Sequence, residues 1–216
     1  MEEDITGDGI REYIILEGYL LSENSNYYTD VWVDIQSSFA QQWKISFPGG
    51  YHPKLELLDI THDGTVDLIY ESAVKENGRH FNYQLYTLKN GKVQQIELPR
   101  NKYVRGEFID DFKISIQISP NEKVILEDVS SKKSFYIKNQ IYEDTGKLLK
   151  KQQLTIFPIS QMEPILISKS KGYGLKTIQE VRGIHDKDLL GEIVTLWYYK
   201  ENEWIKLKTD WKPTAK

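Results

Sequence analysis

Short stretches of alternating or continuous apolar residues recur along the chain and predict β-strands. Phe112–Ile118 alternates apolar and polar residues with a period of two, which is the pattern of a strand with one buried face. Similar strand-like stretches are Tyr13–Leu16, Asp30–Ile35, Leu68–Tyr70, Tyr83–Leu88, Val93–Leu98, Val124–Leu126 and Ser134–Ile137. No long stretch has the spacing of an amphipathic helix. The pattern therefore predicts an all-β protein built from antiparallel meanders.

The strand pattern repeats, and an Asp-Gly segment opens the first two repeats. These segments begin at Asp4 and Asp59, 55 residues apart, and a strand-like stretch follows each of them. Leu196–Trp204 aligns without gaps on Leu85–Val93, at an offset close to two such periods. A period of this length is typical of propeller blades and similar arrays. We therefore expect meander units that resemble β-propeller blades, in an open or shortened array if the units are too few to close.

Three segments follow from this repeat. Residues 1–100 form two units with Asp-Gly loops, residues 101–154 form an inserted β-meander or a decayed unit, and residues 155–216 form a third unit. The loop of the third unit falls near Ser168–Ile178, where the acids are missing and lysines stand among their places. This third loop is predicted not to bind a metal ion.

The first two Asp-Gly segments carry oxygen ligands at the spacing of a metal-binding loop. Ca²⁺ prefers six to eight oxygen ligands in a flexible geometry, with water completing the shell. The predicted ligands are Asp59, Thr61, Asp63, the Thr65 carbonyl and Asp67 in one loop, and Asp4, Thr6, Asp8, the Ile10 carbonyl and Glu12 in the other. Gly64 follows the central aspartate and permits the left-handed turn that folds the loop. Ca²⁺ is accordingly the predicted cofactor.

Neither loop is an EF-hand, because the twelfth position, which carries a bidentate Glu in EF-hands, is Ile15 in one loop and Tyr70 in the other. The motifs Asp-x-Thr-Gly-Asp-Gly-x-x-Glu and Asp-x-Thr-x-Asp-Gly-x-x-Asp resemble the calcium loops of FG-GAP/VCBS-type repeats, found in integrin-like propellers and secreted bacterial proteins. The resemblance implies a metal ion that holds a loop between strands without taking part in chemistry. The alternative is that both segments are plain turns, since Asp and Gly dominate turns for backbone reasons.

The composition limits the classes of partner that the chain can bind and the cellular locations that fit it. A net charge of −4 with both signs well mixed argues against nucleic acid as a partner. Cysteine is absent, which excludes disulfides and thiolate sites. No apolar run in this chain approaches a transmembrane segment, and acidic residues follow Met1. We expect an extracellular or cell-envelope protein, secreted or a lipoprotein, of a Gram-positive bacterium with its leader removed; a cytoplasmic location is the alternative.

Catalytic residues are not predicted, because none of the common catalytic or nucleotide-binding motifs is present. The sequence therefore predicts a Ca²⁺-binding β-repeat module with a structural or binding role, not an enzyme, whose partner is an unknown protein or glycan. The alternative is a hydrolase acting on cell-envelope polysaccharide, with carboxylates such as Glu17, Glu71 and Glu180 as candidates. A hydrolase needs a concave pocket with two carboxylates of shifted pKa, whereas a binding module needs only a surface patch.

Aromatic residues are plentiful near both ends of the chain, among them Trp32 and Trp43 in the first unit and Trp204 and Trp211 in the last. Strand alternation directs at least half of such side chains into the core, where their large area stabilises the sheets. Those that remain exposed could stack on sugar rings.

Overall fold

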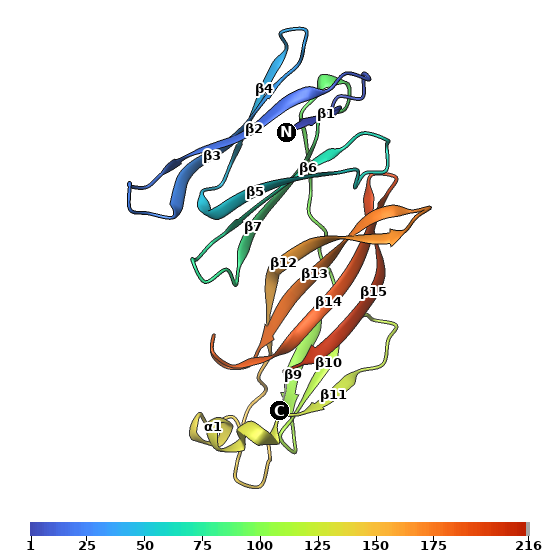
Figure 1. Ribbon diagram of the computed structural model, residues 1–216. Coiled ribbons are helices and arrows are strands. Elements are labelled where there is room, and N and C mark those ends of the chain that lie inside the picture. Colours follow the sequence, from blue (N-terminus) through green and yellow to red (C-terminus); the bar gives the residue numbers. More distant parts are fainter. Residues whose placement is uncertain (215–216) are drawn as a thin grey trace. The chain divides into compact units, whose positions relative to one another are not determined.

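The computed structural model describes residues 1–214 and consists mainly of antiparallel β-sheet (Figure 1). Strands account for 55% and helices for 6%, and the sheets within the described residues are open, without a closed barrel. The predicted all-β, antiparallel meander fold is confirmed. Residues 215 and 216, the end of the predicted third unit, lie outside the described residues.

The chain divides into two compact units. Unit 1 comprises Met1–Pro99, Gln161–Lys176 and Trp197–Leu207, and unit 2 comprises Arg100–Ser160, Thr177–Leu196 and Lys208–Lys216. Each unit therefore combines a continuous stretch of chain with shorter stretches from the C-terminal part. The predicted division into repeat units follows different boundaries and stays a prediction.

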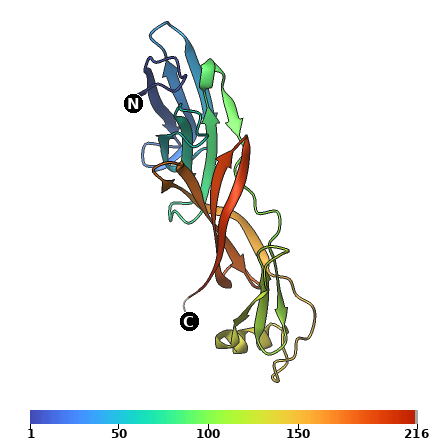
Figure 2. The ribbon, with the colours of Figure 1, turned by 90° about the vertical axis from the view of Figure 1, so that its right-hand side faces the viewer.

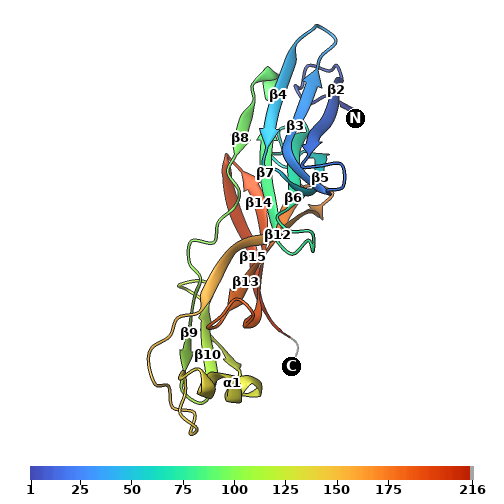
Figure 3. The same cartoon turned by 90° about the vertical axis from the view of Figure 1, so that its left-hand side faces the viewer.

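Unit 1 contains an eight-stranded sheet in the order β1-β2-β3-β5-β6-β7-β8, with β4 paired to β3. Its strands are β1 (Glu2–Glu3), β2 (Glu12–Leu20), β3 (Tyr27–Gln36), β4 (Gln42–Phe47), β5 (Gly50–Leu58), β6 (Asp67–Ala73), β7 (Phe81–Thr87) and β8 (Gln94–Ile96). On one side β3 pairs with β2. On its other side it pairs with β4 along Val31–Gln36 and with β5 at Tyr27 and Tyr28 (Figure 3). Strand β4 therefore extends the sheet beside the second half of β3.

The core of unit 1 is formed by the inward-facing residues of these strands. Ile14 of β2, Val33 of β3 and Leu68 of β6 are at most 1% exposed. Phe47 of β4 stacks on Tyr70 of β6, with ring centroids 4.2 Å apart and an angle of 4° between the planes. Since offset aromatic pairs stabilise beyond the area they bury, this pair ties β4 to β6 through the core.

In unit 2, a three-stranded sheet in the order β11-β10-β9 packs with a short helix (Figure 2). Its elements are β9 (Arg105–Ile109), β10 (Lys113–Gln117), β11 (Ile125–Asp128), the 3₁₀ helix η2 (Ser130–Lys132) and α1 (Lys133–Lys138). Phe108 and Tyr142 are fully buried and meet edge to face, with ring centroids 6.1 Å apart. The Tyr142 hydroxyl donates within 2.8 Å of the Ile109 and Lys113 carbonyls, which satisfies this polar group in the core.

The predicted strand at Ser134–Ile137 is wrong, because these residues lie in helix α1. A run of four residues is too short for its period to distinguish a strand from a helical turn. Here one side chain, Tyr136, is fully buried in the core of unit 2, and its neighbours on both sides are less buried. A single buried aromatic side chain fits one turn of helix as well as it fits a strand, so its burial does not reveal which of the two forms.

A four-stranded sheet in the order β12-β13-β14-β15 contributes stretches of every strand to each unit. Its strands are β12 (Thr155–Ser168), β13 (Gly172–Arg182), β14 (Leu189–Lys200) and β15 (Glu203–Pro213). The β14–β15 turn consists of Glu201 and Asn202, both with positive φ, as the favoured two-residue hairpin turn requires. The predicted position of the third loop, Ser168–Ile178, contains the end of β12, the short β12–β13 turn and the first seven residues of β13.

Candidate functional site

The two Asp-Gly loops have closely matching hydrogen-bond patterns. In the N-terminal loop, Asp4 accepts hydrogen bonds from the Gly7 and Gly9 amides, at 2.7 and 2.8 Å. In the second loop, Asp59 accepts from the Asp63 and Gly64 amides, at 3.2 and 3.1 Å. The first aspartate of each loop therefore serves as the acceptor for amides on the far side of its own turn.

The central aspartates behave in the same way. Asp8 accepts from the Ile10 amide at 2.8 Å, and Asp63 accepts from the Thr65 amide at 3.0 Å. Asp63 also lies beside an ammonium group of the chain, because Lys89 Nζ is 3.3 Å from its carboxylate and 2.9 Å from its carbonyl oxygen. A cation from the protein itself therefore contacts the second loop.

The ninth-position acids, Glu12 and Asp67, are both fully buried. Glu12 accepts from the Ile5 amide at 3.0 Å and from the Thr6 hydroxyl at 3.2 Å. Asp67 accepts from the Ile60 and Thr61 amides, at 2.9 and 2.8 Å, and from the Thr61 hydroxyl at 3.3 Å. These acids close each loop onto the strand that follows it. Burial raises the pKa of the Asp67 carboxyl to about 6, although the hydrogen bonds from Thr61 and Ile60 oppose that rise.

A calcium ion needs oxygen atoms of both loops free to coordinate it. Each predicted carboxylate ligand accepts at least one hydrogen bond from its own loop, and both threonine hydroxyls donate to the ninth-position acid. Within residues 1–214, no three acidic or imidazole side chains gather as a group that could hold a metal ion. The residues as they lie fit hydrogen-bonded turns better than a coordination shell. That Ca²⁺ displaces these hydrogen bonds stays a prediction.

The calcium prediction has a direct test. Extracellular modules bind Ca²⁺ with Kd values of roughly 10⁻⁴–10⁻³ M. At a free concentration ten times Kd, each occupied site adds about 1.4 kcal/mol to the free energy of unfolding. We expect EDTA to lower the melting temperature measured by calorimetry, and Asp63→Ala and Asp8→Ala each to reduce the calcium effect, because each removes a predicted ligand from one loop. An unchanged melting temperature with no heat of Ca²⁺ binding would mean that hydrogen bonds alone close both loops.

A second cluster of polar residues surrounds Trp43 of β4. Its indole Nε1 donates to the Gly91 carbonyl over 2.9 Å, and this bond sets the orientation of the ring. Gly91 has a φ of +69°, and a Cβ added there would lie 3.3 Å from Trp43 Cζ2. Glycine therefore permits both the left-handed turn and the close approach of the ring. The partly buried ring also packs against the core of unit 1.

Two pockets in unit 1 share Trp43 and Gln42 as part of their walls. The first has a volume of about 480 Å³ and includes Asp8, Gln41 and Asn90 in its polar lining. The N-terminal loop therefore forms one wall of this pocket.

The second pocket has a volume of about 440 Å³ and lies over the solvent-facing side of β2, β3 and β4. The polar residues of its lining include Asp34, Gln36 and Lys44. Its apolar wall includes Tyr13 and Ile15, each 55% exposed. The cross-strand pairs Tyr13–Gln36 and Asp34–Lys44 place these side chains on one face of the sheet.

The same face continues along β2 and β3 to Trp32. Its indole Nε1 lies 3.1 Å from a carboxylate oxygen of Glu17 and 2.8 Å from one of Asp34, so the donor is shared between two acids. The Lys44 ammonium lies 4.1 Å from the Trp32 ring centroid, and the ring of Tyr19 is 5.1 Å away. Rings, carboxylates and an ammonium group therefore alternate over this surface.

A family model matches residues 102–212, slightly more than half of the 216 residues, and its description is the YybI C-terminal domain. The chain belongs to the YybI C-terminal domain family. The YybI segment contains the strands from β9 to β14 and all but the last residue of β15, whereas the Asp-Gly loops and the Trp43 pockets precede it. No curated protein and no solved structure matches the chain.

The predicted FG-GAP/VCBS membership is wrong, because the matching family is the YybI C-terminal domain. The resemblance rested on two nine-residue motifs. Such motifs also arise where side chains accept hydrogen bonds from the amides of a turn, which is what both loops do here. None of the helices within residues 1–214 is long and apolar enough to cross a membrane.

The predicted metal residues all lie in the two loops, and of these Thr6 and Asp8 also line the first Trp43 pocket. In the sequence Trp43 is one of many aromatic residues, and no pattern there predicts a role for Gln36, Gln41, Gln42 or Asn90. The available signal was weak. Amide side chains in a turn or at a strand edge are ordinary surface residues until the fold brings them together in a pocket.

Proposed function

We propose that this chain is a non-catalytic binding module of the cell envelope that takes a glycan chain at Trp43. The observation that carries the proposal is an indole ring that its hydrogen bond to Gly91 holds in a set orientation at the wall of a polar pocket. Ligand sites typically combine aromatic walls with a few well-placed polar groups. A sugar presents an apolar C–H face to such a ring and hydroxyl groups around its edge.

The polar residues of the two pockets suit a hydroxyl-rich ligand. Gln36, Gln41, Gln42 and Asn90 each offer both a donor and an acceptor, while Asp8 and Asp34 accept only. Each pocket contains a single carboxylate among its lining residues. A glycosidase needs two carboxylates at one bond, roughly 5–10 Å apart, so this division supports binding without hydrolysis.

The test measures binding of soluble cell-envelope polysaccharides by calorimetry. Trp43→Ala is expected to weaken binding roughly tenfold or more, because truncating a central aromatic anchor commonly removes over 1.4 kcal/mol. Trp43→Phe should retain part of the affinity, since a ring remains but the hydrogen bond to the Gly91 carbonyl is lost.

Trp204→Ala is the matched control. Trp204 is also a partly buried tryptophan of unit 1, and its Nε1 donates to a backbone carbonyl, that of Glu97, over 2.7 Å. We expect this variant to bind glycan like the parent chain. Equal losses in Trp43→Ala and Trp204→Ala, or no binding of any envelope polysaccharide, would refute the proposal.

Hydrolysis of envelope polysaccharide is the second candidate, and one observation favours it. Glu17 and Asp34 both lie within hydrogen-bond distance of the Trp32 Nε1, which brings two carboxylates together on the open face of the sheet. If they act as acid and base, incubation with polysaccharide releases new reducing ends and Glu17→Gln abolishes the release. Binding without any release supports the non-catalytic module.

A further inference from the structure

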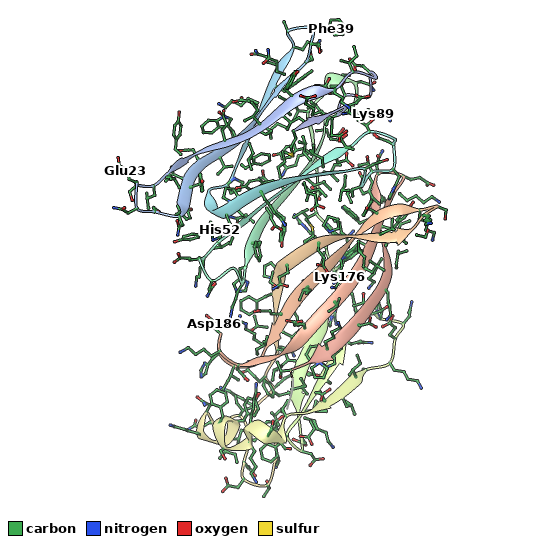
Figure 4. The ribbon with its side chains drawn as sticks, in the orientation of Figure 1. Glu23, Phe39, His52, Lys89, Lys176 and Asp186 are labelled. Atoms are coloured by element: carbon green, nitrogen blue, oxygen red, sulfur yellow. The ribbon has the colours of Figure 1, made fainter. Side chains whose placement is uncertain are left out.

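A pocket of about 740 Å³ lies in unit 2, separate from the residues discussed above. Its walls come from the β13–β14 hairpin, residues 184–188, and from Lys132 and Phe135 at the start of the helical segment. Asp186 lies at the exposed tip of that hairpin (Figure 4). The volume is that of a small-molecule site.

Buried hydrogen bonds hold one wall of this pocket in place. The Asp188 side chain is 2% exposed and accepts from Lys132 Nζ at 2.9 Å, from the Tyr136 hydroxyl at 3.1 Å and from the Ile184 amide at 3.2 Å. A Cβ added at Gly183 would lie 2.0 Å from an Asp188 carboxylate oxygen, so only glycine leaves room for the Asp188 carboxylate in this position. The hairpin and the helical segment are therefore joined before any ligand binds, which lowers the entropic cost of binding.

The apolar part of the pocket is largely aromatic. Phe135 is 37% exposed, and its ring meets the His185 ring edge to face, with centroids 5.7 Å apart. His185 Nε2 lies 3.4 Å from Asn139 Oδ1, a contact that helps to orient the imidazole. Ile184 adds an aliphatic surface beside these rings. Such walls accommodate an aromatic or alicyclic body.

The free N–H donors in the pocket suit an anionic group. Lys132 uses two of its three N–H donors, toward Asp188 and the Leu189 carbonyl, and retains one. The Lys187 ammonium forms no ion pair or hydrogen bond with any residue of the described chain. The charges of Lys132 and Asp188 balance each other, and so do those of Lys187 and Asp186, but the free N–H donors of both lysines can reach a ligand.

We propose that this pocket binds a small organic anion that carries a carboxylate or sulfonate on an aromatic body. The ring of the ligand lies against Phe135 and Ile184, and its anionic group accepts hydrogen bonds from Lys132 and Lys187. The site belongs to the YybI segment and is independent of the glycan proposal, since none of its residues lines the Trp43 pockets.

Two dyes of similar shape test this proposal on the full chain. 8-Anilinonaphthalene-1-sulfonate is an aromatic anion, and N-phenyl-1-naphthylamine is its uncharged counterpart. The parent chain is expected to bind the anionic dye saturably at one site by fluorescence titration, and more tightly than the neutral dye. Lys187→Ala should weaken binding of the anion about fivefold and leave the neutral dye unchanged, as expected when one exposed charge is removed.

Lys138→Ala is the matched control, because Lys138 is an exposed lysine at the end of α1 outside the pocket. It should bind both dyes like the parent chain. Phe135→Ala should weaken both dyes roughly tenfold with an unchanged circular dichroism spectrum, since it removes the ring that both share. Equal effects of Lys187→Ala and Lys138→Ala, or titration of the anion without saturation, would overturn the proposal.

Discussion

Replacing Asp188 with alanine is expected to lower the free energy of unfolding of unit 2 by about 3 kcal/mol, the low end of the loss when one partner of a buried ion pair is removed. The low end applies because the side chain of Lys132, its partner, is 34% exposed. The substitution also leaves the Tyr136 hydroxyl and the Ile184 amide without their acceptor. Burial and the nearby Asp188 carboxylate both raise the pKa of Tyr136, so its hydroxyl stays protonated and keeps its need for an acceptor.

The measurement is urea denaturation followed by circular dichroism, with Asp186→Ala as the control. Asp186 lies two residues away on the same hairpin, and its carboxylate is exposed. We expect its replacement to change stability by less than about 0.5 kcal/mol. Comparable losses for the two variants would show that the Asp188 network contributes no more than a surface ion pair.

Changing the pH in the presence of EDTA is expected to alter stability through Asp67 by about 3 kcal/mol. Burial raises the pKa of this carboxyl from 3.8 to about 6 in the folded state, so folding favours the protonated form. Its contribution to stability is therefore fully present below pH 4 and is lost as the pH rises through 6. A shift of about two pKa units corresponds to about 3 kcal/mol.

Asp67→Asn isolates this contribution, because the amide keeps the shape of the carboxyl group and does not titrate. Its carbonyl oxygen can still accept from the Ile60 and Thr61 amides. The difference in unfolding free energy between the two proteins, measured by urea denaturation, should change by about 2 kcal/mol from pH 4 to pH 7, in favour of the variant. Parallel pH profiles would mean that the hydrogen bonds to Asp67 offset its burial.

Strand periodicity predicted most of the fold, because alternation is a local property of the chain. Phe112–Ile118 alternates in sequence, and β10 lies within it with Ile114 and Ile116 fully buried. The strand predicted at Ser134–Ile137 was wrong for the converse reason. In so short a run, the burial of one residue, Tyr136, was decided by the rest of unit 2.

The Asp-Gly loops were located correctly as turns that precede strands, since Gly64 and Gly9 both have the positive φ such a turn needs. The sequence could not show which way the side chains of the loop aspartates and Glu12 point. A carboxylate at a given position can point toward a shared ion or toward an amide of its own turn, and both uses favour the same residue types. In this structure the acids point toward the amides, and Lys89 reaches Asp63 from 26 residues away.

The sequence by itself determined the all-β class, the antiparallel meanders and the positions of the tight turns, because alternation and backbone preferences act over a few residues. Only the tertiary structure decided where ligands could bind. Trp43 lines a pocket with the N-terminal loop because β4 pairs with β3 and Gly91 approaches its indole. The pocket of unit 2 between the β13–β14 hairpin and the helical segment exists because Lys132 and Asp188, 56 residues apart, form an ion pair. Contacts at such separations depend on how strands pair and layers pack, which no local pattern encodes.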